Sequence, residues 1–133
     1  GDFEAFLAVL PREVDGRRLR HALDVRHPSF ATPEFVALAR RYGCVPVCTD
    51  SDQFPAIADA EADFAYLRLM RSQSDVATGY TPAAIAQWAE GVRTWTTGER
   101  PRDVFVYFIN GAKERAPAGA MALLQQLGMG VRR

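Results

Sequence analysis

Three side chains suited to acid–base or ion-binding chemistry lie close together in one short stretch of the chain, at Asp24, Arg26 and His27. The surrounding residues predict a strand at residues 22–26. Because side chains alternate between the two faces of a strand, Asp24 and Arg26 are expected to share one face, with apolar side chains on the other. Proteins that alternate strands and helices build their sites where the strands end. The stretch therefore predicts where the protein acts, without defining a reaction.

Two arginines, Arg26 and Arg68, are each flanked by apolar residues of a predicted strand. A buried guanidinium is costly unless it is paired. One interpretation is that both arginines face one cleft and grip the carboxylate or phosphate of a small anionic ligand. The alternative is a permanent structural ion pair between either arginine and Asp24 or Asp50.

The acid–base candidates are Asp24, His27 and Asp50. Asp24 and Asp50 follow neighbouring predicted strands, so two carboxyl groups could divide acid and base work across a cleft. His27, which precedes Pro28, could act as a general base. The alternatives are an ion pair or a loop cap for the carboxylates and a capping role for His27. These residues lack the spacing of a dedicated metal site, so we predict no metal ligands, and no motif identifies a cofactor.

The elements that must position these residues alternate along the chain. Apolar runs predict strands at residues 22–26, 45–49, 64–70 and 104–109. Periodicity predicts helices over residues 2–10, from Pro33 to a stop at Gly43, from Pro82 to a stop at Gly98, and from near Pro117 to a stop at Gly128. Residues 12–20 are expected to form a charged connector. This alternation predicts the α/β class, with a parallel sheet covered by helices.

Each predicted helix has one apolar stripe to bury. The stripes are Phe3, Phe6, Leu7 and Leu10 in the first helix, Phe35, Leu38, Ala39 and Tyr42 in the second, Ile85, Trp88, Ala89, Val92 and Trp95 in the third, and Ala120, Leu123, Leu124 and Leu127 in the last. Thr32 and Thr81, each followed by Pro, predict the N-caps of the second and third helices.

The composition restricts the class of protein. With 133 residues, of which 48% are hydrophobic and 24% charged, the chain predicts a single globular domain over residues 1–133. The net charge of zero argues against a nucleic-acid partner. No apolar run approaches the ~20 residues that span a bilayer, so we predict no membrane partner. Cys44 and Cys48, on one predicted strand, are too far apart for a disulfide, which predicts reduced thiols and a cytoplasmic location.

Three stretches carry a family pattern, ALDVRHPSF at residues 22–30, DFAYLRL at 63–69 and VFVYFIN at 104–110. In order and spacing they resemble the YecE-like family, which is catalogued as domain of unknown function 72. That family typically has E-F-R-H-x-S-W, then a strand closing on Asp, then Y-x-R-x-H-G, then Y-x-Y-F-N-N. The resemblance implies a TIM-type (β/α)8 barrel, in a family whose biochemical role is not established.

The resemblance also assigns site residues. Asp24 stands where the family has Glu, and Asp50 matches the acid after the second strand. His27 and Tyr66 match the family's motifs directly. The predicted ligand-binding residues are Arg26, Ser29, Arg68, Tyr107 and Asn110. Phe30, Met70 and Ile109 depart from the pattern, which usually has Trp, His and Asn there. No role is therefore carried over to the Met70 and Ile109 positions.

The chain is short for the implied barrel. An eight-stranded barrel takes about 250 residues, whereas this chain predicts four strands that match the family's C-terminal half. A lone half-barrel would expose two sheet edges and an apolar inner face. We therefore expect a fragment that lacks the N-terminal half of the barrel, a homodimer that completes one, or a rearranged open sheet. A competing function is a non-catalytic domain that keeps the barrel's ion pairs for stability or assembly.

Overall fold

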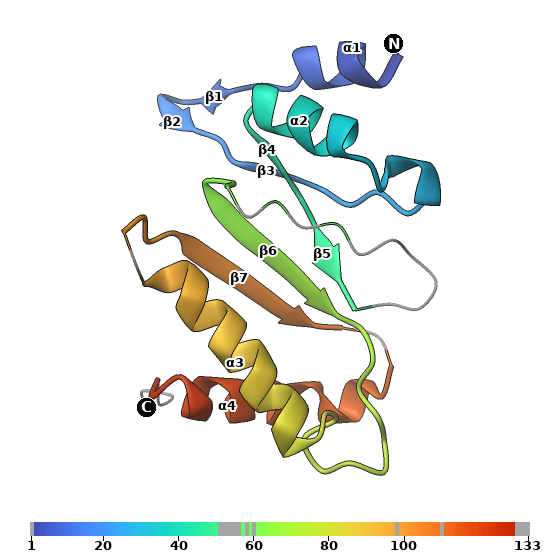
Figure 1. The fold of residues 1–133 in the computed structure, drawn as a ribbon, viewed down its shortest axis with the longest axis vertical. Coiled ribbons are helices and arrows are strands. Elements are labelled where there is room, and N and C mark those ends of the chain that lie inside the picture. Colours follow the sequence, from blue (N-terminus) through green and yellow to red (C-terminus); the bar gives the residue numbers. More distant parts are fainter. Residues whose placement is uncertain are drawn as a thin grey trace.

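The computed structural model describes residues 2–50, 57, 59, 61–97, 99–109 and 111–129. They form an α/β arrangement of helices and mostly parallel strands (Figure 1). The helices are α1 (Asp2–Ala8), α2 (Pro33–Arg41), α3 (Pro82–Thr96) and α4 (Ala116–Gln126), with short 3-10 helices η1 (Pro28–Phe30) and η2 (Lys113–Arg115). The strands are β1 (Glu13–Val14), β2 (Arg17–Arg18), β3 (His21–Leu23), β4 (Cys44–Pro46), β5 (Cys48–Thr49), β6 (Phe64–Leu69) and β7 (Asp103–Phe108).

The parallel strands pair in chain order. β3 pairs with β4, from His21 opposite Cys44 to Leu23 opposite Pro46. β5 pairs with β6, and β6 pairs with β7 along its whole length. Val47, between β4 and β5, donates its N–H to the carbonyl of Leu23 at 2.9 Å. One segment thus pairs first with β3 and then with β6, and strands β3 to β7 form an open parallel array rather than a closed barrel.

The strand boundaries differ from the predicted ones. β3 ends at Leu23, so the expectation that Asp24 and Arg26 lie within the strand is wrong. The second predicted strand is divided into β4 and β5 because the segment changes its pairing partner at Val47. In the register that places Leu23 opposite Pro46, the bond to β3 is donated by Val47, so the N–H that Pro46 lacks is not needed for it. The polar residues after β3 therefore lie in a loop.

The predicted charged connector contains an antiparallel hairpin of β1 and β2. Its turn is Asp15-Gly16, with φ of 53° and 77°. Two successive left-handed residues make the turn that matches the twist of a hairpin, and Asp-Gly is among the pairs that favour it. The Asp-Gly pair is thus the sequence signal of an element that the connector interpretation missed.

Helices α2 and α3 begin as the Thr-Pro pairs predict. The hydroxyl of Thr32 accepts the N–H of Phe35 at 3.1 Å, and the hydroxyl of Thr81 accepts the N–H of Ala84 at 3.2 Å. Each bond satisfies an N–H that has no partner within its helix. The predicted stop of α3 at Gly98 lies outside the described residues.

The buried stripes of the helices are confirmed, with one exception. The buried members are Leu7, Phe35, Ala39, Ile85, Ala89, Val92 and Leu123. The exception is on α1, where Leu7 is 3% exposed but Phe6 is 51% exposed. Helix α1 ends at Ala8, short of the predicted residue 10. Only the face that carries Phe3 and Leu7 packs against the core, and Phe6 lies outside this contact.

The helices cover one face of the parallel strands. Figure 1 shows α1 and α2 beside β3 and β4, and α3 and α4 beside β6 and β7. On β6, Leu69 packs with Ile85 and Leu123 on the helix side. Because strand side chains alternate, Tyr66 and Arg68 point to the opposite face. That face is where the polar residues of the site are found.

Candidate functional site

An ion pair joins Arg68, on β6, to Asp24, which follows β3. The Nη1 group of Arg68 donates to Oδ2 of Asp24, and Nη2 of Arg26 lies 3.5 Å from the same oxygen. The side chain of Arg68 is 19% exposed and that of Arg26 is 55% exposed. One carboxylate therefore contacts two guanidiniums. The predicted grouping of Asp24, Arg26 and Arg68 is present in the structure.

Two tyrosines lie beside this ion pair. Tyr66, on β6, stacks on Tyr107 of β7, with ring centroids 5.0 Å apart and an interplanar angle of 25°. Tyr107 is also the register partner of Arg68. Burial raises the pKa of Tyr66, and the neighbouring Tyr107 raises it further. The Tyr66 hydroxyl thus stays protonated and able to donate a hydrogen bond.

These groups line a cavity of about 350 Å³. We call it the Arg68 cavity, and its walls are Ala22, Asp24, Val47, Tyr66, Arg68, Tyr107 and Ile109. The walls come from all the parallel strands or the residues that adjoin them, on the side away from the helices. An apolar floor with a few convergent polar groups is typical of small-molecule sites.

Asp50 belongs to a different network. Its Oδ1 accepts the N–H of Met70 at 2.7 Å, and its Oδ2 accepts the hydroxyl of Tyr80. The Tyr80 oxygen in turn accepts the N–H of Arg71 at 2.8 Å. Burial and the hydrogen bond to Asp50 raise the pKa of Tyr80. Asp50, Arg71 and Tyr80 line a second cavity of about 290 Å³, which Trp88 of α3 also borders.

The structure does not bring Asp24 and Asp50 together. Thr49 is the register partner of Arg68, so these two residues share a face of the sheet. Asp50 is the next residue after Thr49, and alternation points it to the helix side. The arrangement of two carboxylates across one cleft, which the sequence led us to expect, is therefore not the one observed.

His27 and Ser29 lie apart from the Arg68 cavity. The Nδ1 atom of His27 accepts the N–H of Ser29 at 3.1 Å and lies 2.8 Å from its hydroxyl oxygen. His27 is thereby the N-cap of η1, and both residues are exposed. This geometry matches the capping alternative for His27. Among the described residues, neither His27 nor Ser29 belongs to the lining of the Arg68 cavity.

The structure describes two of the three remaining positions of the family pattern, Met70 and Ile109. Asn110, a predicted ligand-binding residue, lies outside the described residues. Ile109 places an apolar side chain in the wall of the Arg68 cavity. The sulfur of Met70 accepts the hydroxyl of Thr49 at 3.2 Å. The sequence identified Tyr66 only as a match to the family motif. Tyr66 lies two residues before Arg68 on the same strand, so both side chains point to one face, and this spacing could have predicted that Tyr66 lines the cavity.

Two other kinds of site, a metal centre and a membrane-spanning helix, are not formed by the residues that the structure describes. In that part of the chain no group of three or more His, Cys, Asp or Glu side chains is arranged to hold a metal ion. The described helices also include none with the length and apolar character needed to cross a bilayer.

Solved structures resemble this fold. A DUF72 family protein from Enterococcus faecalis V583 superimposes with a TM-score of 0.66 at 16% sequence identity, covering 97% of this chain and 53% of that one. A DUF72 family protein from Thermotoga maritima MSB8 gives a TM-score of 0.64 at 21% identity, covering 80% of this chain and 45% of that one. The chain thus spans about half the length of the solved structures that it matches. No match is found among curated proteins.

The fold and the polar cluster define an α/β protein whose parallel strands follow one another in chain order. Its sequence matches the family described as "Protein of unknown function DUF72" over residues 1–133. The chain therefore belongs to the DUF72 family, as the motifs around Asp24, Arg68 and Tyr107 implied.

Proposed function

We propose that the Arg68 cavity binds a small molecule that carries a carboxylate or a phosphate. The observation that supports this function is that Arg68 borders the cavity with one ion-pair partner, Asp24, in the described part of the chain. A guanidinium has several N–H donors in a planar fork, so Asp24 can hold Arg68 in place while other donors meet a ligand oxygen. Tyr66 and Tyr107 add hydroxyl groups and an aromatic surface to the same cavity.

Asp24 is the acid–base candidate that lines this cavity. In a reaction, its carboxylate would be the group within reach of a bound ligand's proton. His27 and Asp50 are held by their own hydrogen bonds elsewhere. We therefore propose binding as the function and Asp24 as the first residue to examine for catalysis.

A structural role for the ion pairs is the second candidate. It is favoured by the contact of Asp24 with both Arg68 and Arg26, which gives each guanidinium an acidic partner without a ligand. In this case the cluster would tie the loop after β3 to β6 and would take part in no recognition. Its signature would be a large loss of stability, rather than a loss of binding, when Arg68 is removed.

A binding assay separates the two candidates. We would follow the amide NMR signals of the chain during titration with inorganic phosphate, a sugar phosphate and acetate at constant ionic strength. Binding at this site should move signals on β6 and β7, and Arg68→Ala should weaken it about tenfold or more, the cost of a charge-assisted hydrogen bond. Arg17→Ala is the matched control, because Arg17 is an exposed arginine on the distant hairpin. Saturable shifts on β6 that persist in Arg68→Ala would rule out the proposed role of Arg68.

We further propose that residues 1–133 form one unit that corresponds to the C-terminal half of a TIM-type barrel. The support is the set of parallel strands in chain order, together with the half-length coverage of the solved relatives. The missing half would be supplied by a second copy or by an N-terminal half of the same protein, and it would enclose the Arg68 cavity. Light scattering on the purified chain tests the first source, since a monomer at high concentration would exclude the homodimer.

We also propose a reducing compartment, the cytoplasm, for this protein. Cys44 and Cys48 are both free thiols, and structural thiols persist unpaired where the environment is reducing. Burial raises the pKa of both thiols, which makes them less reactive. Fractionation of cells that express the protein is the direct test.

A further inference from the structure

A third cavity, lined by charged residues, lies at the opposite ends of the strands. It has a volume of about 310 Å³, and its lining includes Arg12, Arg18, His21, Arg40, Arg41 and Asp63. His21 is the first residue of β3, and Asp63 directly precedes β6. The Arg68 cavity is formed by the later parts of the same strands. The two cavities are therefore separate sites, and we call this one the hairpin cavity.

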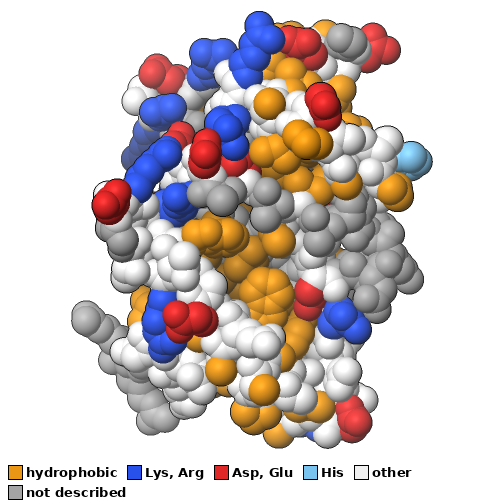
Figure 2. All heavy atoms as spheres, viewed as in Figure 1, with side chains coloured by type: hydrophobic (Ala, Val, Ile, Leu, Met, Phe, Trp, Pro, Cys, Tyr) orange, Lys and Arg blue, Asp and Glu red, His pale blue; other side chains and the backbone are white. Residues whose placement is uncertain are grey.

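Positive charge is concentrated around the hairpin cavity. Its lining brings together four guanidiniums and the single carboxylate of Asp63. Figure 2 shows Arg side chains, with Asp and Glu side chains among them, in the upper part of the molecule, over the β1–β2 hairpin and α2. The chain as a whole has a net charge of zero. An uneven distribution of charge thus produces a local cationic site that the composition does not reveal.

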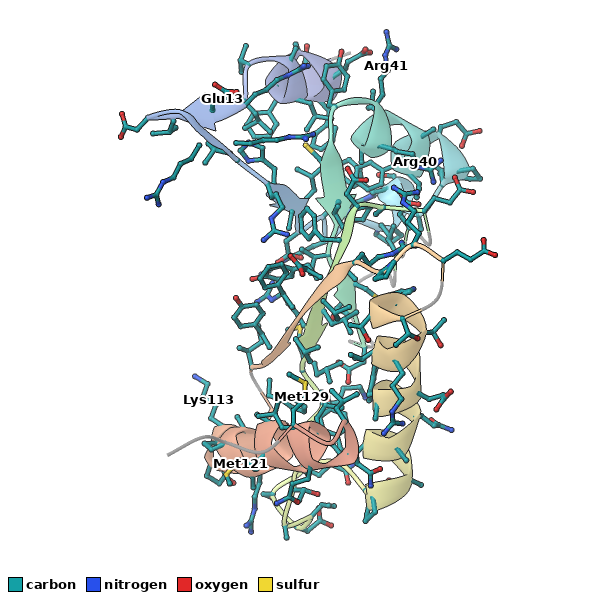
Figure 3. All side chains as sticks on the ribbon, turned by 90° about the vertical axis from the view of Figure 1, so that its left-hand side faces the viewer. Glu13, Arg40, Arg41, Lys113, Met121 and Met129 are labelled. Atoms are coloured by element: carbon teal, nitrogen blue, oxygen red, sulfur yellow. The ribbon has the colours of Figure 1, made fainter. Side chains whose placement is uncertain are left out.

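Part of this charge is already compensated. Arg40 donates to the buried Asp59 through Nη2 at 2.5 Å and through Nε at 3.1 Å. Arg41 lies 3.6 Å from Glu4, and the carboxylate of Asp63 pairs with Arg100 at 2.8 Å. Figure 3 shows Arg40 and Arg41 extending from α2 in different directions. These residues form the charged wall of the cavity rather than its free donors.

Arg12 and Arg18 are different. In the described part of the chain, neither side chain has a hydrogen-bond or ion-pair partner. Glu13 is the register partner of Arg18, yet no ion pair between their side chains is formed among these residues. The pairing of the hairpin that carries both arginines extends to Arg12, because Leu19 donates its N–H to the carbonyl of Arg12 at 2.8 Å. His21 Nε2 also lies 2.7 Å from the carbonyl oxygen of Pro11.

We propose that the hairpin cavity binds the phosphate group of a small phosphomonoester. Arg12 and Arg18 supply two uncompensated positive charges, which a phosphomonoester, at about −1.5 to −2 near neutral pH, can balance. A monocarboxylate would balance one of them. Guanidiniums also match the geometry of phosphate oxygens. The site is independent of the Arg68 cavity and of the function proposed for it.

The cavity favours a small molecule over a nucleic acid. Polynucleotides need an extended basic surface to neutralise successive phosphates. Here Asp63 and Glu13 flank the two free arginines. A compact dianion matches two neighbouring charges better than a long polyanion does, and an oligonucleotide serves as the opposing probe in the test.

Amide NMR titration of the full chain with glycerol phosphate, at constant ionic strength, tests the proposal. We expect saturable shifts around the hairpin and Gly43, and about tenfold or weaker affinity in Arg18→Ala and in Arg12→Ala, because each loses a charge-assisted hydrogen bond. Arg17→Ala, which removes the same charge from the neighbouring residue outside the cavity lining, should bind as the wild type does. Arg68→Ala should also leave these shifts unchanged. The spectra themselves report whether each variant is folded.

Three outcomes would overturn the proposal. One is the absence of saturable shifts at the hairpin. Another is an equal loss of affinity in Arg17→Ala and Arg18→Ala, which would indicate diffuse charge attraction instead of a site. The third is tighter binding of a short single-stranded oligonucleotide than of glycerol phosphate to the same residues, which would assign the surface to nucleic acid.

Discussion

On β6, Leu67 and Leu69 face the helices with 2% and 0% of their surface exposed, whereas Tyr66 and Arg68 face a cavity of about 350 Å³. The helix side gains its stability from apolar burial, which needs no particular partner atom. The cavity side depends on directional contacts between an ion pair and two stacked rings. One strand thus separates the residues that hold the fold from those that are available to a ligand.

The largest effect is expected from truncating the helix side. Leu69→Ala removes a side chain with no exposed surface and leaves a cavity, so it should lower the free energy of unfolding by about 2–5 kcal/mol. Arg68→Ala should cost about 1 kcal/mol, because Asp24 remains partly solvated and keeps its contact with Arg26. Urea unfolding of both variants gives the comparison.

The comparison fails if the two losses are equal. A cost for Arg68→Ala as large as that of Leu69→Ala would mean that the Asp24 ion pair holds the fold, which favours the structural role over ligand binding. Arg17→Ala controls for removing a positive charge from a surface where no packing is lost.

An intermediate effect is expected from Asp50, the polar group on the helix side. Asp50→Ala takes the acceptor away from the N–H of Met70 and from the hydroxyl of Tyr80. Partly buried donors without partners cost about 1–3 kcal/mol, so the variant should be destabilised by about that amount in urea unfolding. Asp75→Ala is the matched control, since Asp75 is exposed in the loop before α3. A variant of Asp50 as stable as that of Asp75 would show that water replaces both bonds.

The contrast between Asp24 and Asp50 also shows how far the sequence determines the site. Both acids follow strands in the chain, and that position was predictable from apolar runs and polar ends. Their separation to opposite faces depends on a register in which Thr49 lies opposite Arg68. A shift of one residue in that pairing would reverse the faces. The register between strands that are distant in the chain is set by tertiary packing, so it could not be predicted from this single sequence.

Features that depend on residues close in the sequence were predicted more accurately than features that depend on the pairing of distant strands. Thr32 and Thr81 were predicted as N-caps because a cap bonds only to residues of the next turn, and both predictions are confirmed. The family motif likewise identified Arg68 and Tyr107, which line one cavity. The cap formed by His27 is also local, but its imidazole could be interpreted as a catalytic base, and only the structure shows its bond to Ser29.

The smallest effect on the free energy of unfolding is expected at high pH, from Tyr66 on the cavity side and Tyr80 on the helix side. Burial raises the pKa of Tyr66 on the cavity side, and burial together with the bond to Asp50 raises that of Tyr80 on the helix side, from an ordinary value of 10.0. A raised pKa in the folded state means that the neutral phenol is favoured there. The associated stability is therefore complete below about pH 10 and is lost as the pH rises toward the folded-state pKa.

Single Tyr→Phe variants can assign this alkaline loss to a face. Tyr80→Phe should flatten the fall of unfolding free energy between about pH 9 and about pH 11 more than Tyr66→Phe, because Tyr80 has the larger rise in pKa. Tyr42, whose pKa is raised by its bond to Glu4, provides the control at a third location. An identical pH dependence in Tyr80→Phe and the wild type would mean that Asp50 does not depend on the Tyr80 hydroxyl. The polar contribution on the helix side would then come from the bond between Asp50 and Met70 and not from Tyr80, and the difference between the two faces of β6 would be sharper than the structure indicates.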